Sequence, residues 1–130
     1  MTRLLRLRGS YARQRAENRS PFSFERGNLL PNAPQHRLQA RLTMAAADIQ
    51  SHYVVSHGSR HFLDRANQRP VPVRTVHGAG LRARLSSSLT TAFEIRNLTD
   101  DQVADLWGYP LPGRSWFLSF EYDLSLSPAP

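Results

Sequence analysis

The sequence contains no cysteine and no lysine. The absence of cysteine excludes disulfides, and it excludes sites that bind a metal or perform redox chemistry through a thiolate. All 17 basic residues are arginines, and with 10 acidic residues they give a formal net charge of +7. A surplus of this size is compatible with nucleic acid, an anionic membrane surface or an acidic ligand. The charge alone therefore leaves three kinds of partner open.

The chain also lacks long apolar runs. No stretch approaches the roughly 20 apolar residues that a transmembrane helix requires. At 130 residues the chain is expected to form one modest domain. Two classes remain, soluble proteins and β-barrels, because a barrel strand conceals its apolar residues in an alternating pattern.

Patterns typical of catalysis or metal binding are missing as well. His57 and His61 have i, i+4 spacing, which brings two ligands together on a helix, but Gly58 and Ser59 between them predict a turn. The sequence contains no nucleophile elbow and no phosphate-binding glycine loop. We therefore expect solvated loop histidines rather than metal ligands, no catalytic residues and no cofactor, so the protein is not expected to be an enzyme.

Alternation of apolar and polar residues predicts six strands. The last run is the clearest, because Trp116, Leu118 and Phe120 point to one side while Ser119 and Glu121 point to the other. The six predicted strands are residues 3–14, 37–46, 49–57, 73–85, 89–97 and 115–124. Consecutive runs are expected to pair as hairpins, which gives an all-β, antiparallel β-meander in a single domain, residues 1–130.

The connections between these strands alternate in length. Residues 15–36, 58–72 and 98–114 form long connections, whereas 47–48 and 86–88 form short ones. All long loops then lie at one end, as in outer-membrane barrels, which combine short periplasmic turns with long extracellular loops. The sequence predicts a piece of a transmembrane β-barrel, which is incomplete because closure requires about eight strands.

Nine charged residues fall on the side of their runs opposite the apolar residues: Arg6, Arg8, Arg41, Arg82, Arg84, Glu94, Arg96, Glu121 and Asp123. Arg6 and Arg8 belong to the first run, and Glu94 and Arg96 belong to the fifth. An arginine turned toward lipid at the membrane midplane would cost about 2–4 kcal/mol. The apolar side is therefore expected to face lipid, and Trp116, next to the last long loop, is expected at the membrane interface.

The last long connection is predicted to contain one short helix. Thr99 and Gln102 have the spacing of a capping box, and Val103 and Leu106 are about one helical turn apart. Gly108 and the prolines after it would end this helix and lead the chain into the last strand.

The residues around this connection resemble a known family. The segment FEIRNLTDDQVADLWGYPLPGRSWFLSFEYDL, residues 93–124, looks like the C-terminal end of TonB-dependent outer-membrane receptors. In that family the penultimate strand closes with an Asn-Leu pair and an Asp, here Asn97, Leu98 and Asp100. A Gly-Tyr-Pro-Leu-Pro-Gly-Arg stretch, here residues 108–114, then precedes the final strand. The segment LLPNAPQHRLQARL is similar to the family's Leu-Pro-x-x-Pro stretch before an earlier strand.

The resemblance implies a C-terminal fragment of a receptor that takes up siderophores or cobalamin-type ligands across the cell outer membrane by energy coupling. A complete member has a barrel of about 22 strands around an N-terminal plug domain, which contacts TonB. No plug domain is expected within this chain. The implied partners are the remainder of the barrel and the plug, TonB through the absent plug, outer-membrane lipid and the siderophore or vitamin ligand. The loop residues that could contact the ligand are Arg60, His61, Arg65 and Trp107.

Two other interpretations stay open. An arginine-rich β-surface with aromatic side chains could bind nucleic acid or another anionic partner. Here the aromatic residues fall on the face opposite the arginines, whereas a stacking platform needs both on one face. The remaining alternative is a soluble β-rich domain of another function. Under the receptor interpretation nucleic acid is not a partner, and the isolated chain is expected to aggregate through its unpaired edges.

Overall fold

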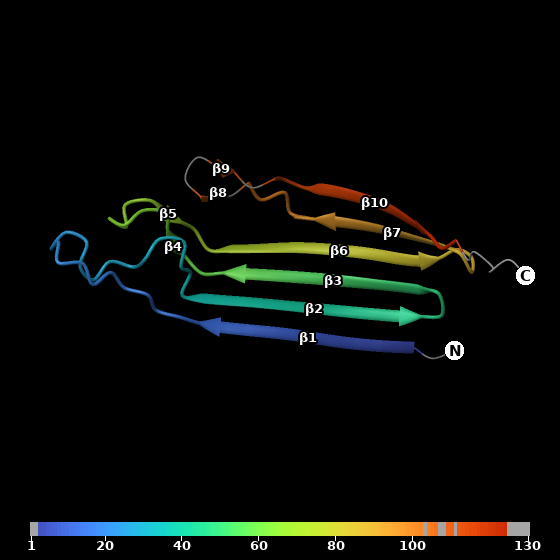
Figure 1. Cartoon of the computed structure of the whole chain (residues 1–130). Helices are drawn as coiled ribbons and strands as arrows, with labels where there is room; N and C mark the ends of the chain where they lie inside the picture. The colour runs from blue at the N-terminus through green and yellow to red at the C-terminus, as the bar shows by residue number, and fades with distance from the viewer. Residues whose placement is uncertain (1–2, 103, 107–108, 111, 125–130) are drawn as a thin grey trace, which may run out of the picture.

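The protein forms a six-stranded antiparallel sheet in a computed structural model, which describes residues 3–102, 104–106, 109–110 and 112–124 (Figure 1). The strands are, in spatial order, β1 (Arg3–Arg13), β2 (His36–Ala46), β3 (Ile49–Gly58), β6 (Arg74–Arg84), β7 (Leu89–Arg96) and β10 (Ser115–Tyr122). The sheet is open, since the described part of the chain contains no pairing between β1 and β10. The all-β antiparallel meander expected from the sequence is confirmed.

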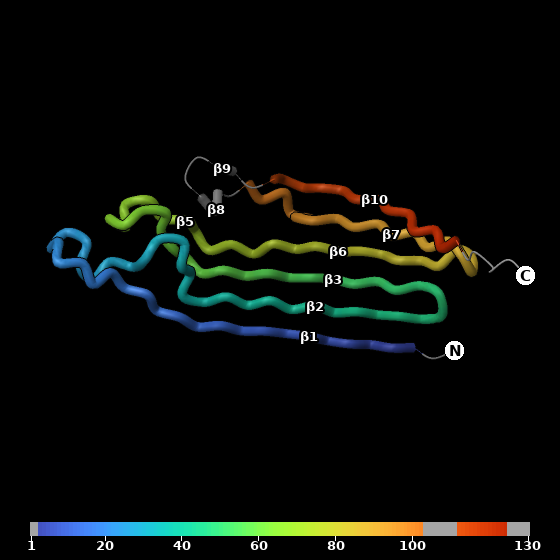
Figure 2. Tube along the Cα trace, viewed as in Figure 1, coloured from blue at the N-terminus to red at the C-terminus, as the bar shows by residue number. Residues whose placement is uncertain are grey.

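Two small hairpins extend the connections. One pairs β4 (His61–Phe62) with β5 (Pro70–Val71), and the other pairs β8 (Ala104–Leu106) with β9 (Tyr109–Pro110). No helix occurs in the described residues. The connections between the six long strands are sorted by length. The long connections lie at one end of the sheet and the short ones at the other (Figures 1 and 2). We call these the loop end and the turn end.

The short helix predicted in the last long connection is therefore wrong. Ala104–Leu106 is a strand, and Val103 and Gly108 lie outside the described residues. The backbone that would open the helix is held by Asn97. Its side-chain oxygen accepts a hydrogen bond from the Asp101 N–H at 3.1 Å, and its amide nitrogen donates to the Asp101 carbonyl at 3.0 Å. Asp100 also has a positive φ of 59°, which a right-handed helix excludes.

The pairing register places most large apolar residues of the six strands on one face, because directly paired residues share a face of the sheet; Leu4, Val54, Val76 and Phe117 lie on the other face. Leu5, Met44, Ser51, Leu81, Phe93 and Leu118 form one row across the strands. The large apolar side chains of this apolar face are Leu5, Leu7, Tyr11, Leu38, Leu42, Met44, Ile49, Tyr53, Val55, Leu81, Leu89, Phe93, Ile95, Trp116, Leu118, Phe120 and Tyr122.

The opposite face carries most of the charge. We call it the arginine face, and its basic residues are Arg6, Arg8, Arg37, Arg41, Arg74, Arg82, Arg84 and Arg96. Two glutamates on the same face pair with arginines: Glu121 with Arg82 at 2.7 Å and Glu94 with Arg96 at 2.6 Å. Arginines outnumber carboxylates on this face, and Arg8 lies directly opposite Arg41. The face is therefore electropositive.

The sheet has no hydrophobic core of its own. Among the described residues, only Pro34, Val71 and Asn97 are buried, and none of them belongs to the six long strands. Large side chains of the apolar face are exposed instead, for example Leu7 by 72% and Phe120 by 67%. A single-layer sheet with this much exposed apolar surface needs a second layer or an apolar solvent to cover it.

The turns that join neighbouring strands are tight. Ala47 and Asp48 join β2 to β3, and Ala47 has a φ of 50°. Between β6 and β7, the hydroxyl of Ser86 accepts hydrogen bonds from the N–H groups of Ser88 and Leu89 at 3.3 and 3.1 Å.

In the part of the chain that the structure describes, no helix has the length and apolar character needed to cross a membrane.

Candidate functional site at the loop end

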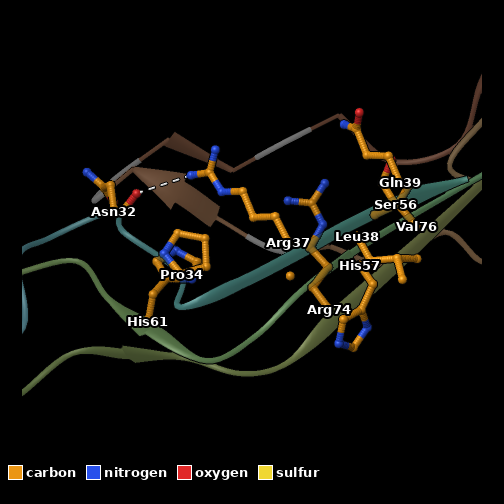
Figure 3. Close-up of a pocket in the computed structure, with 11 residues that line it drawn as sticks. Asn32, Pro34, Arg37, Leu38, Gln39, Ser56, His57, His61, Arg74 and Val76 are labelled. Atoms are coloured by element: carbon orange, nitrogen blue, oxygen red, sulfur yellow. Dashed lines mark hydrogen bonds between the residues drawn. The ribbon is translucent and has the colours of Figure 1, made fainter. Parts of the chain in front are cut away.

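A cavity of about 490 Å³ lies where the arginine face meets the long loops. Its lining includes Arg37 and Gln39 of β2, Ser56 of β3 and Arg74 of β6, and Asn32 and His61 contribute from the connections (Figure 3). Figure 3 shows Arg37 extending toward Asn32, whose carbonyl accepts a hydrogen bond from Nη2 of Arg37 at 3.5 Å. The His57 ring points away from the two guanidinium groups.

The two arginines of the cavity occupy one row of the sheet. Arg37 pairs with Gly58, and Gly58 pairs with Arg74, so the glycine lies between them on the intervening strand. A Cβ at Gly58 would meet no atom within 4 Å, so the space above this glycine is open. Among the described residues that line the cavity, none is acidic. Guanidinium groups on both sides of an open space suit an anionic, oxygen-rich ligand.

The first two long loops are joined to each other by Asn67. Its side-chain oxygen accepts a hydrogen bond from the Leu29 N–H, and its amide nitrogen donates to the Leu29 carbonyl, both at 2.8 Å. Asn28 adds a hydrogen bond to the Arg65 carbonyl at 2.9 Å. The Asn32 N–H donates to the Phe62 carbonyl at 2.8 Å. We call this junction the loop clasp, defined by these five residues and Asn67.

Asp64 organises the second loop next to the clasp. Its carboxylate accepts hydrogen bonds from the backbone N–H groups of Gln68 at 3.1 Å and Arg69 at 2.7 Å. Desolvation alone would raise the pKa of Asp64, but hydrogen bonds from the backbone N–H groups outweigh it and lower this pKa below its ordinary value of 3.8. The carboxylate is therefore held in its charged form as part of the loop fold.

The third long connection is fastened at its base by the residues that carry the sequence resemblance. Asn97 is 8% exposed, and its amide also donates to the Pro112 carbonyl at 3.3 Å. The Oδ1 atom of Asp100 accepts a hydrogen bond from the Arg114 N–H at 2.6 Å. A Cβ at Gly113 would lie 2.6 Å from the same oxygen, so a side chain at position 113 would displace the Asp100 carboxylate. These residues therefore have a structural role in closing the loop.

The loop residues proposed from the sequence lie in different places. His61 lines the cavity, and its Nδ1 contacts the Ser59 carbonyl at 3.4 Å. Arg60 is exposed beside it, and Arg65 is exposed at the loop clasp. Trp107 lies outside the described residues. The structure thus brings only His61 of the described three to the cavity lining.

Sequence reasoning missed Arg37 and Arg74 as site residues. Both lie at the loop-end limit of a strand, and 36 other residues separate them in the chain. Arg37 is the second residue of β2 and Arg74 is the first of β6, and they share a row only through the register of both strands with β3, which alternation along one strand does not give. His57 and His61, which have helical spacing in the sequence, lie in β3 and β4. Among the described residues, no group of three or more His, Cys, Asp or Glu side chains could hold a metal ion.

No protein-family model and no curated protein matches this sequence. A solved structure does match: the crystal structure of the siderophore receptor PiuA from Acinetobacter baumannii, with a TM-score of 0.76 and 18% sequence identity. The similarity covers 91% of this chain and 19% of that chain, so the present chain spans about a fifth of the length of the receptor it matches. That protein is a receptor and not an enzyme. The chain therefore has the fold of a segment of a siderophore receptor.

Proposed function

We propose that this chain is the C-terminal segment of a TonB-dependent outer-membrane receptor, in which it contributes barrel wall and extracellular loops for energy-coupled uptake of a siderophore or cobalamin-type ligand. The observation that carries the proposal is the exposed apolar face of a single-layer sheet, with eight of the strand arginines on the other face and only Arg3 and Arg13, at the two ends of β1, on the apolar one among the described residues. The similarity in fold to a siderophore receptor supports it.

The free-energy cost of turning arginines toward lipid decides which face of the sheet would meet the membrane. An arginine that faces lipid at the midplane costs about 2–4 kcal/mol, and the arginine face carries eight arginines. Lipid would cover the apolar face and replace the missing second layer. The arginine face would then line the interior, where the plug and the remainder of the barrel are its partners. TonB would act through that plug, which is outside this chain.

The loop end would be extracellular, since outer-membrane barrels have their long loops outside. The cavity with Arg37, Arg74 and His61 would then open toward the interior near the outer surface. We propose that it contributes to capture of an anionic, oxygen-rich ligand, with Arg60, Arg65 and Trp107 as further loop contacts. The ligand is a siderophore or vitamin rather than a substrate to be converted, and the chain needs no cofactor for this role.

The test determines which face meets the apolar phase. In the full chain carrying W107F, Trp116 is the single tryptophan, and it lies on the apolar face. The matched variant W107F/W116F/F117W moves the tryptophan by one residue, to the arginine face. Both are folded in neutral detergent micelles, and fluorescence is compared between ordinary detergent and detergent with brominated chains, which quench tryptophan on contact.

We expect strong quenching of Trp116 and little quenching of the tryptophan at position 117. Equal quenching at both positions, or stronger quenching at 117, would contradict a lipid-covered apolar face. Unfolded chain in the micelles is detected by circular dichroism, and a chain without β-structure there would count against the proposal as well.

An anion-binding soluble domain is the second candidate, and the electropositive arginine face is the observation in its favour. Most aromatic side chains lie on the other face, whereas Phe117 on this face is covered by Arg96, whose Cζ lies 4.6 Å from the ring centroid. Stacking of bases needs free rings beside the arginines. Salt-dependent binding of single-stranded nucleic acid by a soluble, monomeric chain would favour this candidate.

A further inference from the structure

Three histidines lie on the loop-end part of the apolar face. They are His36 in β2, His57 in β3 and His77 in β6, and we call them the histidine band. The register fixes their face, since His57 pairs with Leu38, and His77 pairs with Val55. His36 is two residues before Leu38 on the same strand and therefore shares its face. All three side chains are partly exposed.

Each ring of the histidine band has the same kind of partner, a hydroxyl group at Nδ1 from a neighbouring strand. The Tyr11 hydroxyl lies 2.7 Å from Nδ1 of His36, and the Thr75 hydroxyl lies 2.9 Å from Nδ1 of His57. The Tyr53 hydroxyl is hydrogen-bonded to Nδ1 of His77. Both tyrosine rings also stack on their histidines, with centroids 6.1 and 5.9 Å apart.

This repeated arrangement can orient three N–H donors. With each hydroxyl as the donor to Nδ1, the ring proton lies on Nε2, the atom at the far side of the ring. Among the described residues, the strands carry no carboxylate on this face, whereas Arg13 lies on it directly opposite His36. The band therefore presents Nε2–H donors and one guanidinium next to a large apolar surface, and it contains no internal acceptor for them.

The course of the band across the sheet matches that of a membrane surface. Barrel strands tilt by about 40°, so a plane parallel to the membrane shifts about 4 Å along each successive strand, given a strand spacing of about 4.8 Å. From His36 to His57 to His77 the level shifts by two residues per strand toward the turn end. Shifts that keep a side chain on the same face come in steps of two residues, about 6.6 Å, and one such step is closer to about 4 Å than no shift is.

We propose that the histidine band binds phosphate groups of the lipid headgroup layer, through the Nε2–H donors of His36, His57 and His77 with Arg13 beside them. This inference rests on the proposed function, because it requires lipid on the apolar face. Lipid tails cover the leucine and phenylalanine side chains, and the band lies at the level where acceptor-rich phosphates begin. The occupant is the phosphorylated membrane surface, and free phosphate is tested against it.

The experiment uses the full chain in neutral detergent micelles, titrated with phosphatidic acid as the probe. The ¹⁵N chemical shifts of the histidine rings report the Nδ1 and Nε2 sites separately. We expect saturable shifts at Nε2 of the three band histidines and no comparable shift at His52, which lies on the arginine face above Gly80. Inorganic phosphate at the same concentration, and oleic acid as a carboxylate lipid, are expected to give weaker binding.

Two sets of variants separate the donors from the rest of the ring. Asn retains an oxygen that can accept the hydroxyl hydrogen bond but lacks a donor at the Nε2 position, whereas Gln places an amide nitrogen near it. We expect H36N/H57N/H77N to bind phosphatidic acid at least about tenfold more weakly than the wild type. H36Q/H57Q/H77Q should retain most of the affinity, and H52N on the other face is the control.

Wild-type affinity in the Asn variant, or an equal loss in the Asn and Gln variants, would overturn the proposal. Inorganic phosphate that shifts the band as strongly as phosphatidic acid would also overturn it in favour of a free-anion site. The wild-type shifts need no variant to fold, so they test the proposal independently. If Trp116 quenching succeeds and the band does not respond, only this inference fails. If the quenching fails, the proposed function fails first.

Discussion

The side-chain amide of Asn67 joins the first two long loops by pairing with both the N–H and the carbonyl of Leu29. Its backbone has a φ of 57°, a conformation that Asn tolerates better than most residues. At the residue scale, single polar side chains of this kind hold the loops, since the apolar residues of the sheet provide no core beneath them.

Replacement of Asn67 tests this role. N67G keeps the positive φ but loses the two hydrogen bonds, so the loop clasp should open more easily by about 2 kcal/mol. N67A should add about 1 kcal/mol of backbone strain to that loss. Hydrogen exchange at the Leu29 amide measures the opening, and amides in the middle of β2 serve as the control. Unchanged Leu29 protection in both variants would contradict the role.

Asp64 makes the second loop sensitive to acid. Its pKa is lower in the folded loop than its ordinary value of 3.8, so the stabilisation is present above the unfolded pKa and is lost as the pH falls through the folded pKa. We expect the protection factors of the Gln68 and Arg69 amides to decrease as the pH is lowered below 3.8. D64N, which cannot ionise, should remove this pH dependence; a wild-type profile in D64N would assign it to another group.

At the scale of elements, the third connection illustrates how a loop is shaped by contacts between its two ends. Asn97 and Asp100 at its start hold Asp101, Pro112 and Arg114 in place. The Asp100 carboxylate occupies the space that a side chain at position 113 would enter.

G113A should therefore destabilise this connection by about 1–3 kcal/mol, because the added methyl group must displace the Asp100 carboxylate. The D100G background removes the carboxylate and still allows the positive φ of position 100. In that background the same G113A change should lower the free energy of unfolding much less. Equilibrium unfolding of the single and double variants in micelles measures the coupling free energy between positions 100 and 113. Additive effects would show that the clash is not the cause.

The strands were predictable because their signal is local. Alternation from Trp116 to Phe120 requires no knowledge of the partner strand, and a one-residue error would invert the face of every side chain. The predicted helix failed because the Asn97 side chain, outside the predicted helix, binds the backbone of its first turn. The pairing of Arg37 and Arg74 across Gly58 depends on the register of three strands, which sequence alternation alone does not provide.

The whole molecule is a single layer with two dissimilar faces and two unpaired edges, β1 and β10. Edge strands with free N–H and C=O groups pair readily with other chains. The apolar face adds exposed leucine and aromatic surface to this tendency.

We therefore expect the isolated chain to aggregate in aqueous buffer and to become dispersed, with β-structure, in neutral detergent micelles. Size-exclusion chromatography and circular dichroism in the two conditions measure this. L7R/L118R on the apolar face should weaken uptake into micelles, whereas T43R/S119R on the arginine face is the control with the same added charge. A soluble monomer with a cooperative thermal transition in buffer would disprove this expectation.

The strict alternation of the two faces also limits how the gene of such a chain can change in length. One codon inserted between Leu38 and Leu42 in β2 would turn the two leucines to opposite faces. Two codons inserted there would leave both leucines on the same face. The residues of the long connections do not alternate between two faces, because they are held by individual side-chain hydrogen bonds. Insertions and deletions in descendants of this chain should therefore collect in residues 14–35, 59–73 and 97–114, while the long strands diverge by substitution.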